Sequence, residues 1–79
     1  MTTGKWIVVK NNSCRSIPRE AEPLYIVEVN TDQEFDVFNT WLLKHDYYAY
    51  GYGYERYFGD KLKNVPHKTV YSFCKSVKS

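Results

Sequence analysis

The chain has 79 residues, a length that predicts one domain, residues 1–79, with a small hydrophobic core. Hydrophobic residues make up 43% and charged residues 25%, so the chain is not disordered throughout, and its net charge of +2 is too mild to indicate nucleic-acid binding by itself. Its apolar runs are far shorter than the roughly 20 residues of a transmembrane helix, and residues 1–10 lack the features of a signal peptide. We therefore expect a cytoplasmic protein without a membrane segment.

The first two predicted elements are β-strands. Residues 5–10 (KWIVVK) are rich in β-branched side chains and too few for a stable helix. Residues 24–29 (LYIVEV) send alternate side chains to opposite faces, as a strand does. Between them, residues 11–23 contain two prolines and an Asn-Asn-Ser run, which predicts a surface loop, either ordered or mobile.

An amphipathic helix over residues 32–45 has the clearest local signal. The run Thr31-Asp32-Gln33-Glu34 fits a capping box, with Thr31 as the N-cap and Glu34 reaching back to it. Apolar residues then recur every three or four positions and form one stripe, which a sheet must cover. The stripe consists of Phe35, Phe38, Trp41, Leu42 and His45.

Residues 46–58 (DYYAYGYGYERYF) are the most unusual segment. Its two glycines weaken a helix by about 1 kcal/mol each, so we predict a strand, ended by the Gly-Asp turn that follows. The two faces of such a strand differ sharply. One face is a row of tyrosines, Tyr48, Tyr50, Tyr52 and Tyr54, and the other carries Ala49, Gly51 and Gly53.

The C-terminal residues 69–77 fit either a helical stripe or an alternating strand. Their Val, Tyr, Phe and Thr content favours a strand, and we expect residues 76–79 to fray. The predicted element order is therefore β-β-α-β-β. This order indicates an α+β fold in which one amphipathic helix packs on an antiparallel sheet.

Charged residues are unevenly distributed along the chain. Residues 20–36 contain six acidic and no basic side chains, whereas residues 61–79 contain five lysines and no acidic side chain. Two arrangements are consistent with this pattern. The segments lie on different faces and steer the approach to a partner, or they neutralise each other within the fold.

The sequence favours neither an enzyme nor a cofactor or metal site. It contains no nucleophile elbow, glycine-rich phosphate loop, His-Glu-x-x-His motif or Cys-x-x-Cys motif. The potential zinc ligands lack the close pairing of structural zinc sites, and the two cysteines are expected to remain thiols in a reducing compartment. These residues are Cys14, His45, His67 and Cys74.

The tyrosine row has two interpretations. In the first, the rings fill the core of a domain with few leucines while their hydroxyl groups reach water. In the second, the helix covers the bare face of the strand, and the tyrosines point outward to a surface that a partner covers. The candidate partner-binding residues are Tyr48, Tyr50, Tyr52, Tyr54, Arg56, Tyr57, Lys61 and Lys63.

The pattern favours a protein partner over a nucleic acid. Single-stranded nucleic acid is the alternative, with bases stacked on the rings and phosphates on the flanking Arg56, Lys61 and Lys63. The acidic segment opposes it, as does the absence of a known RNA-binding motif. A short, motif-free chain rich in Lys, Asn and Tyr resembles the general style of small bacteriophage proteins that bind and inhibit a host enzyme or defence complex. We expect a stoichiometric inhibitor or adaptor, either a monomer or a homodimer.

Overall fold

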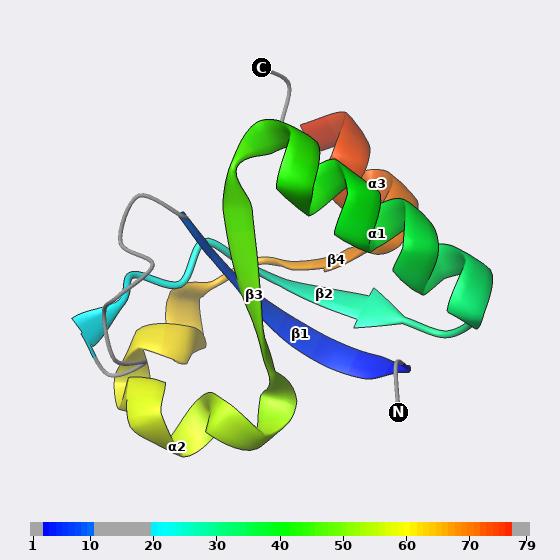
Figure 1. Cartoon of the computed structure of the whole chain (residues 1–79). Coiled ribbons are helices and arrows are strands. Elements are labelled where there is room, and N and C mark those ends of the chain that lie inside the picture. Colours follow the sequence, from blue (N-terminus) through cyan, green and yellow to red (C-terminus); the bar gives the residue numbers. More distant parts are fainter. Residues whose placement is uncertain (1–2, 11–19, 77–79) are drawn as a thin grey trace.

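The computed structural model describes residues 3–10 and 20–76. The described strands form one sheet in the order β3-β1-β2-β4 (Figure 1). This arrangement confirms the predicted α+β fold, with two strands followed by the long helix as the sequence predicts. The elements are β1 (Gly4–Lys10), β2 (Tyr25–Val29), α1 (Asp32–His45), β3 (Tyr47–Gly51), the 3-10 helix η3 (Tyr52–Tyr54), α2 (Glu55–Phe58), the 3-10 helix η4 (Gly59–Asn64), β4 (His67–Thr69) and α3 (Val70–Ser76).

The sheet is mixed, where the sequence predicted an antiparallel one. Strand β1 runs antiparallel to both β2 and β3, and its residue Trp6 pairs with Val27 on one side and Gly51 on the other. Strand β4 runs parallel to β2, with His67 opposite Ile26. The difference arises because residues 52–66 form a crossover from β3 at one edge to β4 at the other, and strands joined by such a crossover run in the same direction.

Helical segments cover both faces of the sheet. Helices α1 and α3 lie over one face, here called the α1 face, and the segment from η3 to η4 lies over the other, the α2 face (Figure 1). Side chains alternate along β1, so Trp6 and Val8 pack toward the α1 face while Ile7 and Val9 pack toward the α2 face. A strand buried on both sides explains the nearly continuous apolar run in β1.

The core is divided between the two faces. The α1 face holds the larger cluster, in which the rings of Phe38 on α1 and Phe73 on α3 are fully buried and meet edge to face at 5.7 Å. The cluster on the α2 face is smaller and is centred on Phe58, which packs with Ile7, Val9 and Ala21. The buried residues of the larger cluster are Val8, Val27, Val29, Phe38, Leu42, Val70 and Phe73.

Helix α1 forms where the capping box and the apolar stripe predict it. The backbone N–H of Glu34 donates to Thr31 Oγ1 at 3.1 Å, while Glu34 Oε1 accepts from the N–H of Asn30 at 2.9 Å. The helix ends at Asp46, which adopts the left-handed conformation with φ 64° and donates its N–H to the carbonyl of Leu42. Local sequence signals thus define both ends of the helix.

The N-cap gives a direct test of this local stability. Replacing Thr31 by alanine removes the side-chain acceptor for the Glu34 N–H and should lower the free energy of unfolding by about 1 kcal/mol. Urea titration followed by circular dichroism measures the change. Thr31→Ser retains the hydroxyl group and is the matched control. An unchanged unfolding midpoint in Thr31→Ala would contradict a role for the cap.

One predicted strand is too long, and another is wrong because its residues form a helix. The strand expected over residues 46–58 ends at Gly51, because the next residues turn under the sheet and bring Phe58 onto the α2 face. The strand expected over residues 69–77 is a helix from Val70 onward. A helical turn places Val70 and Phe73 on the same side, where both are fully buried, and Thr69 Oγ1 accepts the N–H of Ser72 at 3.2 Å.

Several sequence predictions fall partly outside the described residues. Residues 11–19 include most of the predicted loop, and residues 77–79 include most of the predicted frayed tail. Cys14 lies in the first of these ranges, so the predictions about its thiol, a disulfide or a zinc ligand stay predictions. Within the described part of that loop, Ala21 is buried. Directly after the loop, Leu24 donates its N–H to the carbonyl of Val8 at 2.8 Å.

Candidate protein-binding surface

Aromatic rings from β3, η3 and α2 form a connected series on the α2 side of the molecule. The ring centroids of Tyr48 and Tyr50 are 4.9 Å apart, those of Tyr50 and Tyr54 are 5.4 Å apart, and those of Tyr54 and Tyr57 are 5.7 Å apart. Tilted and edge-to-face pairs at these distances are favourable aromatic contacts. We call these four tyrosines, together with Arg56, the tyrosine surface.

The tyrosine surface is anchored at its centre and exposed around it. Tyr50 is half-buried and its ring lies 5.8 Å from that of Phe58, so it belongs to the smaller core cluster. The neighbouring rings retain large exposed fractions: 48% for Tyr48, 45% for Tyr54 and 38% for Tyr57. The row is therefore part core and part surface, with each of the two sequence interpretations describing some of its members.

Two cationic side chains lie over exposed rings. The guanidinium carbon of Arg56 is 5.1 Å from the ring centroid of Tyr57, and its Nη2 donates to the Tyr57 hydroxyl at 3.3 Å. On η3, Tyr52 lies beneath Lys5, whose Nζ is 5.7 Å from the ring centroid. Cation–π contacts of this kind limit the conformations of long side chains at the surface. Tyr52 thus contacts β1 through Lys5.

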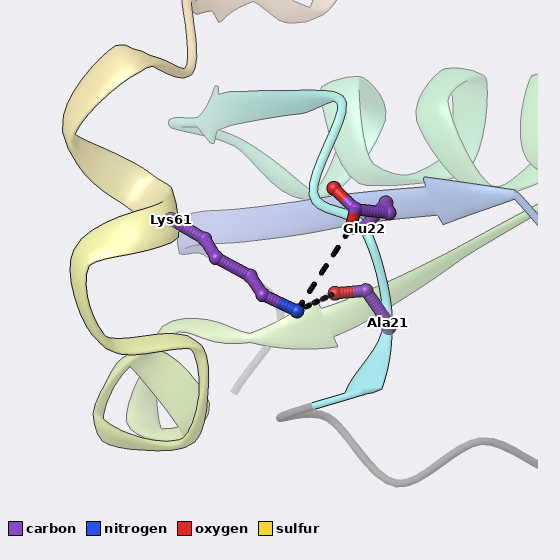
Figure 2. A network of polar contacts seen from close by, with 3 residues as sticks. All are labelled: Ala21, Glu22 and Lys61. Carbon is purple, nitrogen blue, oxygen red and sulfur yellow. Dashed lines mark hydrogen bonds and ion pairs between the residues drawn. The ribbon is translucent and has the colours of Figure 1, made fainter.

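The two predicted site lysines make contacts of a different kind. Lys61 Nζ donates to the carbonyl of Ala21 at 3.4 Å and lies 4.0 Å from Glu22 Oε1 (Figure 2). Lys63 Nζ lies 3.5 Å from Asp60 Oδ1. The contact with Glu22 lies between one residue of the basic segment and one of the acidic segment, and the two arrangements of the charged segments stay predictions. Both ion pairs are exposed and contribute little to stability.

A shallow apolar groove that the sequence did not predict lies between α1 and β3. Its volume is about 140 Å³. Leu43, which lies outside the predicted helical stripe, is 75% exposed at this groove. A leucine on the polar side of an amphipathic helix is the sequence signal that could have indicated this groove. The lining residues are Trp6, Phe35, Phe38, Asn39, Leu42, Leu43, Tyr47, Tyr48 and Ala49.

The described residues also bear on catalysis and metal binding. Among them, no group of three or more His, Cys, Asp or Glu side chains is placed to hold a metal ion. Partial burial raises the pKa of the Cys74 thiol, the opposite of the shift that activates a cysteine nucleophile. None of the helices over residues 3–10 and 20–76 has the length and apolar character needed to cross a membrane.

Comparison of the chain with protein-family models, curated proteins and solved structures finds no match.

Proposed function

We propose that the chain is a small non-enzymatic protein-binding module that docks on its target through the tyrosine surface and acts as a stoichiometric inhibitor or adaptor. The exposed rings of Tyr48, Tyr54 and Tyr57 beside Arg56 carry the proposal. Tyrosine and arginine are among the residue types enriched at binding hot spots, because they offer a large area with few rotatable bonds or a rigid set of donors. The anchor through Tyr50 and Phe58 supports a preformed surface.

The placement of the lysines favours a protein target over single-stranded nucleic acid. Bases would stack on the exposed tyrosines, and phosphates would need cations alongside them. Lys61 and Lys63 instead contact Glu22 and Asp60, which would repel phosphates. The specific observation in favour of nucleic acid is the pairing of Lys5 with Tyr52 and of Arg56 with Tyr57.

The composition and the absence of a catalytic motif support the proposed class of target. A small aromatic-rich chain without catalytic motifs, in the style of bacteriophage proteins that inhibit a host enzyme or defence complex, would act by occupying a surface that the target needs for another ligand. Inhibition should then reach its limit at equimolar protein and should not progress with time. An inhibition that continues to grow at substoichiometric protein would show turnover and contradict the proposal.

Binding through the tyrosine surface can be tested with two exposed rings. The double variant Tyr54→Ser/Tyr57→Ser should remain folded by circular dichroism, because both side chains are exposed and Tyr50 and Phe58 keep their packing. Each ring at a hot spot contributes about 2 kcal/mol or more, so the dissociation constant for the captured target should rise by at least about 30-fold per ring. Surface plasmon resonance should show this as faster dissociation with little change in the association rate.

Tyr71→Ser is the matched control for this experiment. Tyr71 is 54% exposed but lies on α3, away from the tyrosine surface. Equal binding by the wild type, the control and the double variant would reject the tyrosine surface as the docking site. For the nucleic-acid alternative, a labelled oligonucleotide should bind with an affinity that falls with salt at a log–log slope of about −0.7 per phosphate neutralised. No binding at low salt would remove that alternative.

A further inference from the structure

Strand β3 is an unprotected edge of the sheet. It is the outermost strand on one side in the part of the chain that the structure describes, and its residues, Tyr47–Gly51, contain neither a charged residue nor a proline. The opposite edge, β4, is only three residues long, follows Pro66 and contains Lys68. Proteins commonly prevent edge-to-edge pairing with short strands, lysine and proline. The contrast between the two edges marks β3 as a pairing site.

We propose that a second copy of the chain pairs with this edge, β3 against β3 in antiparallel orientation, with Ala49 at the two-fold axis. In this register Tyr48 lies opposite Tyr50 of the second copy, and Tyr47 lies opposite Gly51 of the second copy. Nothing lies within 4 Å of the position that a Cβ atom would take at Gly51, so there is room for a ring above it. The strand is thus self-complementary, with aromatic pairs on one face and a tyrosine over a glycine on the other.

Charge complementarity selects the second copy as the occupant. Asp46 directly precedes β3 and Tyr52 directly follows it, so antiparallel pairing of the two strands brings Asp46 of each copy near the end of β3 where Tyr52 of the other begins η3. The ammonium group of Lys5 already lies over Tyr52, at 5.7 Å from its ring centroid. Asp46 of each copy therefore approaches Lys5 of the other, and two-fold symmetry makes this contact twice. A strand from an unrelated protein would lack this match.

The apolar groove between α1 and β3 lies at the same edge. Tyr48 and Ala49 line it from β3, and the highly exposed Leu43 lines it from α1. Pairing of the two β3 strands brings the grooves of the two copies together beside the axis. Burial of Leu43 there would account for a large apolar side chain that is left in water in the single chain.

The dimer can be tested by sedimentation equilibrium from about 10 μM to about 1 mM, the range in which weak dimers dissociate. The wild type should show a mass approaching twice 9.4 kDa. Leu43→Glu places like charges near the axis and should raise the dissociation constant at least about tenfold, without loss of folding because Leu43 is exposed. Tyr71→Glu on α3 is the matched control and should dimerise as the wild type does. The measurement contains no target protein, so its outcome is independent of the proposed function.

A cross-link tests the register. In a Cys14→Ser/Cys74→Ser background, Ala49→Cys should form a disulfide-linked dimer on mild oxidation, because residue 49 faces its own copy across the axis at a distance that suits a disulfide. Ser72→Cys on α3 is equally a surface position and should form no disulfide-linked dimer, because it lies away from the β3 edge. Two results would overturn the proposal. The first is a wild type that stays monomeric up to about 1 mM, in which case a strand of the target would be the occupant of the β3 edge. The second is a dimer that does not cross-link at residue 49.

Discussion

Replacing Phe73 by alanine should remove most of the stability of the protein. The ring is fully buried and joins α3 to the rest of the core, with its centroid 5.7 Å from Phe38, 4.7 Å from Trp41 and 5.5 Å from Tyr25. Truncation of a buried phenylalanine costs about 3–5 kcal/mol through lost burial and the cavity that remains. A chain of this size has a total stability at the low end of about 5–15 kcal/mol, so the loss removes most of it.

Circular dichroism and urea titration at 25 °C measure the effect. Tyr71→Ala is the matched control on the same helix, because Tyr71 is 54% exposed and its truncation should change the free energy of unfolding by no more than about 0.5 kcal/mol. Phe73→Leu retains most of the volume and should give an intermediate stability. A Phe73→Ala protein with the unfolding midpoint of the wild type would show that α3 does not dock on α1.

The elements that the sequence predicts well are those whose signals are local. Helix α1 has its cap, its apolar stripe and its charged ends within residues 31–45, and all of them are used as expected. Strands β1 and β2 are similarly specified by β-branched residues. Within the stripe, Phe38 and Leu42 are buried, whereas Trp41 is half-buried and stacks on His45 at 4.1 Å and on Tyr47 at 5.5 Å.

The segment after Gly51 could not be predicted from its own residues. Alternating tyrosine and glycine are equally compatible with an extended strand and with the turn that forms η3. The decisive interaction is distant in sequence, because Phe58 needs the apolar pocket formed by Ile7, Val9 and Ala21 on the α2 face. The same kind of distant contact decides α3, where Val70 and Phe73 turn toward the aromatic cluster on α1.

The sequence identified candidate residues for the site but did not predict how their side chains are arranged in space. The sequence singled out tyrosines that do meet in space, yet it placed Tyr52 in the same row, whereas the structure pairs Tyr52 with Lys5. It also grouped Lys61 with the tyrosines, because the two are near in sequence. The helical turn of η4 instead directs Lys61 toward Ala21 and Glu22. Side-chain direction in short helices depends on the tertiary packing that positions them.

Replacing Phe58 by alanine should abolish target binding while leaving every exposed tyrosine in place. Phe58 is the buried residue of α2, and α2 has four residues, too few to hold a helix by itself in water. Its truncation costs about 3–5 kcal/mol, and that loss falls on the smaller cluster with Ile7 and Val9 rather than on the larger one around Phe38. The segment from η3 to η4 should therefore open locally.

Hydrogen exchange and surface plasmon resonance together test this local opening. The amides of residues 52–64 should exchange faster by about 10²–10³-fold, which corresponds to the loss of about 3–4 kcal/mol, while those of α1 change far less. Phe58→Leu keeps most of the packing and should retain binding, which separates loss of anchoring from loss of an aromatic contact with the target. Tyr54→Ser provides the opposite comparison, because it should weaken binding without faster exchange in α2. Binding that survives in Phe58→Ala, with exchange as slow as in the wild type, would show that the tyrosine surface holds its shape without the anchor on the α2 face.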